Sequence, residues 1–145
     1  MEYDYLYEMY KIPKKKINQI NNETELISVV FNDFNVQNAK NFISYSDLSL
    51  NEISQIVPVS LSTLQRTFKN KKKLNSALSE VFIELGEIYK IGLQAFDGNK
   101  ERLNEYLHTE NPYFNHKRPL DIMNTHKGRD LVKDELLRIE YSGFS

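Results

Sequence analysis

The amino-acid sequence predicts an all-α protein, with a helix-turn-helix region followed by a second helical half. Apolar residues recur at steps of three and four along most of the chain, which is the spacing of an amphipathic helix. A pair of short capped helices separated by Pro58 lies near the middle of the sequence. Only residues 3–7 fit the alternating pattern of a strand, and because Tyr3, Leu6 and Tyr7 suit a helical face equally well, that segment stays ambiguous.

Composition limits the possible classes of protein. The 145 residues, of which 40% are hydrophobic, suffice for one core of ordinary size or for two small ones. The absence of cysteine excludes disulfides and thiolate metal sites. No window approaches the roughly 18 apolar residues of a membrane span, and residues 1–20 lack the apolar stretch of a signal peptide. We therefore expect a cytoplasmic protein with no membrane partner.

Two helices are predicted in the first third of the chain. Asn22 is placed to cap the first, because a short polar side chain there can accept a hydrogen bond from a free backbone amide. The apolar positions of this helix are Leu26, Ile27, Val30, Phe31 and Phe34. A second, shorter pattern follows, with apolar positions at Ala39, Phe42 and Ile43.

The longest helical pattern covers residues 74–96 and predicts the central helix of the core. Its outer face is assigned to Glu80, Glu84, Glu87 and Lys90, and Gly98 follows as a C-terminal stop. Shorter helices are predicted at residues 99–108 and from Pro119. The last helix is predicted at residues 128–140, with its buried face formed by Leu131, Val132, Leu136 and Ile139.

Residues 49–69 carry the signals of two short helices joined by a tight turn. Ser49 and Glu52 have the spacing of a capping box, Pro58 ends the first helix, and Ser60 can cap the second. The second helix would bury Leu61, Leu64 and Phe68. This arrangement is typical of the helix-turn-helix, which places its second helix in the major groove of DNA.

Side chains on the outer face of the second helix, and the basic run after it, suit DNA contacts. Arg66 and Gln65 can hydrogen-bond to guanine and adenine edges, while hydroxyl groups and lysines can hold phosphates. The candidate DNA-binding residues are Ser60, Ser62, Thr63, Gln65, Arg66, Lys69, Lys71, Lys72 and Lys73. Capped helix pairs also occur in proteins that never touch DNA, so a plain helical hairpin with a solvated basic face is the alternative.

Charge is unevenly distributed, although the net charge is only −1. Residues 60–75 contain basic side chains and no acidic ones, whereas residues 76–110 are mainly acidic. A basic patch beside an acidic surface suits a protein with two different partners. Solvated helix faces of opposite sign are the alternative.

No residue pattern indicates a catalytic or a metal site. The sequence has no glycine-rich phosphate loop and no G-x-S-x-G motif. The spacing of His108, His116 and His126 matches no compact zinc pattern, so we expect surface histidines. Asp134 and Arg138 have the four-residue spacing of an ordinary surface ion pair. We expect no enzymatic activity, and an enzyme that uses the histidines is an alternative.

Residues 118–145 contain a helix start led by proline, a glycine, and a last helix that ends in Arg-Ile-Glu-Tyr. The positions of this motif are Pro119, Leu120, Asp121, Ile122, Met123, Thr125, Gly128, Val132, Leu136, Arg138, Ile139, Glu140 and Tyr141. The motif resembles the C-terminal toxin-binding region of the Xre/MbcA/ParS antitoxins, the partners of RES-domain toxins. The likeness extends over roughly residues 24–145 and is most specific at the C-terminal end. One departure is that Ser142 stands where the family has glycine, with Gly143 one place later.

The resemblance implies a two-part protein. Residues 22–74 would form the Xre-like helix-turn-helix region, bind operator DNA and repress the protein's own operon, usually as a homodimer. Residues 75–145 would bind a RES-domain toxin that uses NAD⁺ and block its active site. Residues 1–21 have no counterpart in the family and would form an N-terminal arm, either helical or dimerising. The protein would need no cofactor. A helix-turn-helix regulator without a toxin partner is the alternative.

The end of the last helix is the candidate toxin-binding site, because aromatic and arginine side chains there can project into a concave partner. The alternative is that Tyr141 and Phe144 fold back and hold the last helix on the core. The candidate toxin-binding residues are Arg138, Glu140, Tyr141, Ser142, Gly143, Phe144 and Ser145.

Overall fold

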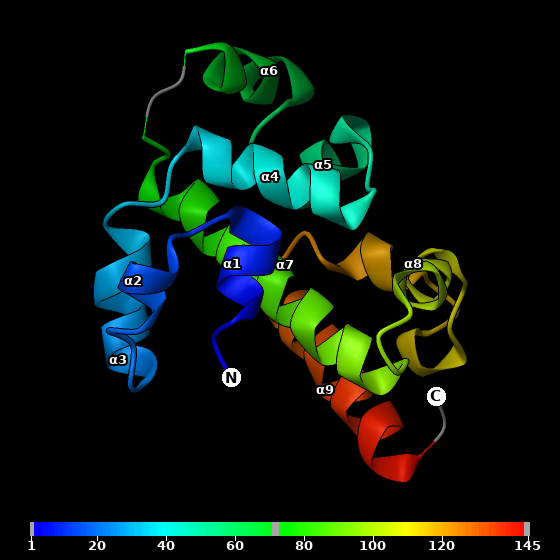
Figure 1. Ribbon diagram of the computed structural model, residues 1–145. Coiled ribbons are helices and arrows are strands. Elements are labelled where there is room, and N and C mark those ends of the chain that lie inside the picture. Colours follow the sequence, from blue (N-terminus) through cyan, green and yellow to red (C-terminus); the bar gives the residue numbers. More distant parts are fainter. Residues whose placement is uncertain (1, 71–72, 144–145) are drawn as a thin grey trace. The chain divides into compact units, whose positions relative to one another are not determined.

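The computed structural model describes residues 2–70 and 73–143, and the elements in these ranges are helices, without a strand (Figure 1). The all-α prediction is therefore confirmed for this part of the chain. No described helix is both long enough and apolar enough to cross a membrane. The elements in chain order are α1 (Tyr5–Tyr10), α2 (Lys14–Ile17), α3 (Glu23–Leu26), the π-helical turn η1 (Ile27–Phe31), α4 (Val36–Ser46), α5 (Leu50–Ile56), α6 (Leu61–Lys69), α7 (Ser76–Ala95), α8 (Lys100–His108), the short 3-10 helices η2 (Pro112–Phe114) and η3 (Pro119–Ile122), and α9 (His126–Ser142).

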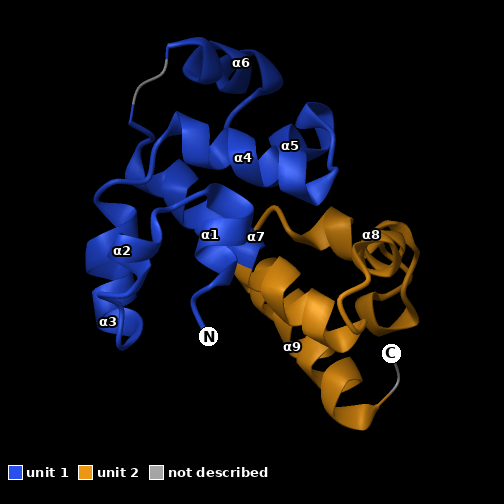
Figure 2. Cartoon of the chain, in the orientation of Figure 1, with its two compact units in different colours: residues 1–86 blue, residues 87–145 orange. Residues whose placement is uncertain are grey.

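The chain divides into two compact units, residues 1–86 and residues 87–145 (Figure 2). The boundary falls inside helix α7. The functional boundaries predicted after residues 21 and 74 stay predictions.

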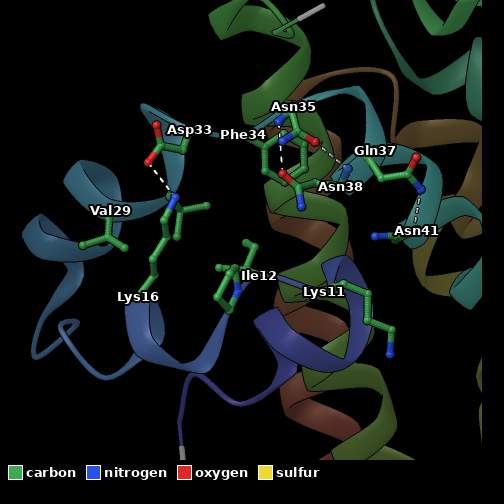
Figure 3. Close-up of a pocket in the computed structure, with 12 residues that line it drawn as sticks. Lys11, Ile12, Lys16, Val29, Asp33, Phe34, Asn35, Gln37, Asn38 and Asn41 are labelled. Atoms are coloured by element: carbon green, nitrogen blue, oxygen red, sulfur yellow. Dashed lines mark hydrogen bonds and ion pairs between the residues drawn. The ribbon is translucent and has the colours of Figure 1, made fainter. Parts of the chain in front are cut away.

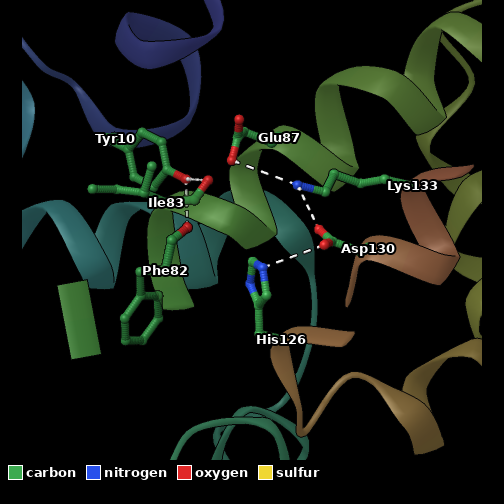
Figure 4. Close-up of polar contacts among 7 residues, drawn as sticks. All are labelled: Tyr10, Phe82, Ile83, Glu87, His126, Asp130 and Lys133. Carbon is green, nitrogen blue, oxygen red and sulfur yellow. Dashed lines mark hydrogen bonds and ion pairs between the residues drawn. The ribbon is translucent and has the colours of Figure 1, made fainter. Parts of the chain in front are cut away.

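Helix α1 is built into the core of unit 1, where it packs on α4. The Tyr10 side chain is fully buried, and its hydroxyl donates a hydrogen bond to the carbonyl oxygen of Phe82 over 2.6 Å (Figure 4). Its ring stacks on Phe42 and meets Phe34 edge-on, with centroids 5.6 and 5.3 Å apart. The segment that was ambiguous in the sequence is therefore helical from Tyr5 onward.

Local capping signals set the start of the next helices of unit 1. The Asn22 side chain accepts a hydrogen bond from the amide of Glu25, as predicted, and Asn35 and Asn38 form a capping box at α4. The helix predicted after Asn22 forms as α3 followed by η1. Ile27 was expected on its apolar face but is 57% exposed, because the wider π-helical turn that begins there changes which positions face the core.

The outer-face assignment of Glu84 in α7 is wrong. This residue is only 6% exposed. Residues 81–86 are all buried, so α7 has no solvent-facing side in this stretch. An amphipathic pattern read from the sequence assumes one exposed face and cannot reveal a helix that is covered all round.

Unit 2 is held together by apolar side chains of α8 and α9, joined through η3. Leu103 and Leu107 of α8, like Val132 and Leu136 of α9, have no exposed surface. Ion pairs add to the α7 and α9 surfaces: the Lys133 Nζ atom lies 3.4 Å from Asp130 and 4.0 Å from Glu87 (Figure 4). Helix α9 extends beyond both of its predicted ends, from His126 to Ser142.

Candidate functional site

The two capped helices α5 and α6 form as the sequence predicts and contact each other. The Ser49 hydroxyl accepts a hydrogen bond from the Glu52 amide, and the Glu52 carboxylate accepts one from the Ser49 amide, each over 3.0 Å. The Ser60 hydroxyl caps α6 by accepting from the Thr63 amide over 3.2 Å. The turn between the helices contains Pro58.

The outer face of α6 displays most of the predicted DNA-binding side chains. Thr63 is partly buried, and its hydroxyl oxygen accepts hydrogen bonds from Arg66 over 3.2 Å and from the Ser60 hydroxyl over 3.0 Å. The hydrogen bond to Thr63 places the Arg66 guanidinium alongside the helix. Lys71 and Lys72 lie outside the described residues. The exposed candidates are Ser60, Ser62, Gln65, Arg66, Lys69 and Lys73.

The end of α9 carries the predicted toxin-binding residues. Ser142 is the last helical residue, and its hydroxyl donates to the Ile139 carbonyl oxygen over 3.0 Å. Gly143 follows in the left-handed conformation, with a φ of 77°. Glycine adopts this conformation without strain. Because the glycine stands one place later here than in the family motif, the helix can continue through Ser142.

Tyr141 is 82% exposed, so its ring does not fold back onto the core. The alternative that Tyr141 holds the last helix on the core is therefore wrong. Phe144 and Ser145 lie outside the described residues. Glu140 is partly buried. Arg138 and Tyr141 are three residues apart in α9, a spacing that places their side chains on the same side of the helix.

A buried carboxylate holds Arg138. The guanidinium donates two hydrogen bonds to Glu135, from Nε to Oε2 over 2.9 Å and from Nη2 to Oε1 over 2.6 Å. The Glu135 side chain is 4% exposed and that of Arg138 is 59% exposed. The hydrogen bonds from Arg138 to Glu135 raise the pKa of the guanidinium. The predicted pairing of Arg138 with Asp134 is wrong, because the nearer carboxylate is the one three residues before it.

The ring of Tyr113, in η2, lies against the same guanidinium. The Arg138 Cζ atom is 5.5 Å from the ring centroid, within the range of a cation–π contact. Tyr113 is 55% exposed, so ring and guanidinium form one surface. Tyr113 was not among the predicted site residues, because this contact joins residues far apart in the chain. The only local signal is a large aromatic residue in a proline-containing loop.

Tyr106 of α8 belongs to the same cluster. Its hydroxyl oxygen is buried and has no hydrogen bond of good geometry among the described residues. Burial raises the pKa of the Tyr106 phenol, and the nearby Glu135 carboxylate adds to the rise, although the Asn111 side chain lies close enough to lower the pKa slightly. A pocket of about 300 Å³ lies beside this ring, between residues of α8 and the loop that contains Pro112.

The three histidines are all exposed, as predicted. His108 Nδ1 lies 2.6 Å from the carbonyl oxygen of Asn104, and His126 Nε2 lies 3.3 Å from Asp130. His116 occupies a left-handed turn, with a φ of 65°.

The exposed side chains at the end of α9 and the guanidinium held by Glu135 suit contact with another protein. Residues 92–141 match the model of the antitoxin Xre/MbcA/ParS C-terminal toxin-binding domain. Residues 92–141 therefore form a C-terminal toxin-binding domain of the Xre/MbcA/ParS antitoxin type, as the motif at residues 118–145 predicts. The matched region includes Arg138, Glu140 and Tyr141. The comparison with curated proteins found no match.

Proposed function

We propose that this protein is an antitoxin that neutralises a RES-domain toxin that uses NAD⁺, by covering the toxin's active site with the end of α9. We further propose that it represses its own operon through α5 and α6, as a homodimer. The toxin-binding residues would be those predicted from the sequence, with Tyr113 added to them.

The observation that carries the toxin half is the arrangement at Arg138. A side chain that must order itself on binding loses conformational entropy, of the order of 1 kcal/mol for a long flexible residue. Glu135 and Tyr113 already restrict the Arg138 guanidinium in the free protein. Arginine and tyrosine are also the residue types that most often dominate binding energy in protein interfaces. The exposed ring of Tyr141 supplies a second anchor on the same side of α9.

Neutralisation tests this half directly. The antitoxin is co-expressed with the RES-domain protein encoded beside it, and growth and cellular NAD⁺ are measured. Truncation after Ile139 and the Tyr141→Ala variant should each fail to rescue growth, while circular dichroism shows retained helix. The exposed residue Lys117 provides the control, since Lys117→Ala should rescue fully. Full rescue by the truncated protein would contradict insertion of the helix end.

The observation that favours the DNA half is the pair of capped helices with an exposed polar and basic second helix. Arg66 and Gln65 are exposed on α6 and can reach base edges in a major groove. Binding to the promoter of the operon should weaken by about 10-fold or more for Arg66→Ala, because a bidentate contact to a base contributes roughly 1–3 kcal/mol. If Arg66→Ala bound the promoter as tightly as the wild type does, this role would be contradicted.

A regulator that acts without a toxin partner is the second candidate, favoured by the same helix pair. Purification from cells that express both neighbouring genes separates the two. An antitoxin should elute with the toxin in one complex, whereas a stand-alone regulator would elute without it and would not rescue growth.

A further inference from the structure

A group of lysines around α2 has no role in the function proposed above. Lys14 and Lys15 are exposed at the start of this helix. The Nζ atoms of Lys11 and Lys14 lie 5.1 and 5.0 Å from the centroid of the same ring, that of Tyr7. The Tyr7 ring thereby holds two ammonium groups near each other, which concentrates positive charge at this place. No carboxylate pairs with Lys11, Lys14 or Lys15 in the part of the chain that the structure describes.

This lysine group lies near the segment that follows α6 and contains Lys73. After α6 the chain returns to pair Lys73 with Asn35 through an antiparallel bridge. Two residues before Asn35, the Asp33 carboxylate forms an ion pair of 2.8 Å with Lys16 of α2 (Figure 3). The hydrogen bond from Lys16 is the main cause of the lowered pKa of Asp33, and the charge of Lys73 contributes as well. Residues of α2 and the segment after α6 therefore lie close together.

Further lysines continue the positive surface toward α6. Lys40 of α4 lies over the ring of Phe68 in α6, with its Nζ atom 5.9 Å from the centroid. Lys40 also lines a hollow with Asn35, the residue that pairs with Lys73. Lys69 ends α6 and is exposed. We call the whole set the lysine strip: Lys11, Lys14, Lys15, Lys16, Lys40, Lys69 and Lys73.

We propose that the lysine strip binds the phosphate backbone of duplex DNA beside the groove that α6 reads. The proposal rests on the DNA-binding half of the proposed function. Within the described residues, Asp33 is the one carboxylate paired with a member of the strip, and it neutralises only part of the charge. A regular polyanion suits such a surface, because each lysine that meets a phosphate releases condensed counterions. Residues 1–21, which had no counterpart in the family, thereby acquire a function: α2 extends the DNA contact.

The salt dependence of DNA binding tests the proposal. The full chain is titrated into labelled promoter DNA of about 30 base pairs at several NaCl concentrations, and the logarithm of affinity is plotted against that of salt. Lys14→Gln/Lys15→Gln should reduce the steepness of this line by about 2, since each lost phosphate contact removes about 0.9. Lys16 is left unchanged because it is already paired with Asp33.

The control is Lys117→Gln/Lys127→Gln, which removes the same charge from exposed positions in unit 2. Its slope should equal that of the wild type. If Lys14→Gln/Lys15→Gln matches this control while Arg66→Ala weakens promoter binding, the lysine strip has no phosphate role and the proposed DNA function stands. If the wild type binds no DNA, both fail. Tighter binding to anionic phospholipid vesicles than to DNA, lost in Lys14→Gln/Lys15→Gln, would overturn the proposal in favour of a membrane surface.

Discussion

The two members of the Glu135–Arg138 pair are exposed to different degrees, so their removal should have different consequences for stability. Arg138→Ala leaves a charged carboxylate in a site that is 4% exposed. We expect the free energy of unfolding to fall by about 1–3 kcal/mol, the usual cost of an unsatisfied buried polar group. Glu135→Gln removes the buried charge and keeps its shape, so stability should change by less than about 1 kcal/mol. Urea denaturation measures both values.

Toxin binding should weaken in both Arg138→Ala and Glu135→Gln. The first removes the guanidinium, and the second replaces one of its two carboxylate acceptors with an amide NH2 group, so that the guanidinium is held less firmly. The matched control is Asp134→Asn, at the exposed position whose spacing alone had indicated the ion pair. Asp134→Asn should keep wild-type affinity for the toxin. Loss of affinity in Asp134→Asn but not in Glu135→Gln would show that Asp134, and not Glu135, positions Arg138.

The buried hydroxyl of Tyr106 should make the protein sensitive to alkaline pH. A raised pKa means that the folded state holds this proton more tightly than the unfolded chain, whose tyrosines ionise near pH 10. The resulting stability is present below about pH 10 and is lost as the pH rises through the folded pKa. Tyr106→Phe also removes a buried hydroxyl that has no hydrogen bond of good geometry among the described residues, so it should raise stability at neutral pH by about 1 kcal/mol.

Thermal unfolding between pH 7 and pH 11 checks this prediction. The melting temperature of Tyr106→Phe should decline less above pH 10 than that of the wild type. Tyr141→Phe is the control at neutral pH, because an 82% exposed ring should tolerate the change without effect. A less stable Tyr106→Phe protein at pH 7 would mean that the hydroxyl has a partner in solution.

At the scale of elements, features that depend on residues close together in the chain could be predicted from the sequence. The caps at Asn22, Ser49 and Ser60 were correct because each joins atoms three residues apart. The burial of Glu84 and the contact between Tyr113 and Arg138 were missed, because both depend on residues far away in the chain. Arg138 and Tyr141 could thus be proposed as site residues from sequence, whereas the groups that orient Arg138 could not.

The junction between η3 and α9 explains one glycine of the family motif. A Cβ atom at Gly128 would collide with the backbone carbonyl oxygen of Ile122. Backbone atoms cannot turn aside as a flexible side chain can, so Gly128→Ala must move η3 away from α9. We expect a loss of roughly 2 kcal/mol or more, at the upper end of the usual cost of overpacking. Urea denaturation measures this loss.

Lys127→Ala is the matched control for that substitution. It introduces the same residue one position earlier in the first turn of α9, at an exposed site. The control should remain within about 0.5 kcal/mol of the wild type, as surface substitutions usually do. Equal stability of the two variants would show that the η3–α9 junction adjusts without cost.

At the scale of the whole molecule, the two proposed binding surfaces belong to different compact units. The exposed face of α6 and the lysine strip lie in unit 1, and the Arg138 cluster and Tyr141 lie in unit 2. The toxin-binding domain could be predicted from the sequence because its motif is local to residues 118–145. The position of α2 beside Lys73 could not, since a bridge between Asn35 and Lys73 has no signature in either segment alone.

Separate surfaces should give separable losses of function. Arg66→Ala should abolish repression of a promoter reporter and leave toxin neutralisation intact, while Tyr141→Ala should do the opposite. The double variant should combine both losses without a further fall in stability, because sites that share no partner have nearly additive effects. A reporter assay and a growth assay on the same four strains measure this. If either single variant impaired both activities while its melting temperature stayed at the wild-type value, the two surfaces would be coupled, and toxin binding would then change the affinity for DNA.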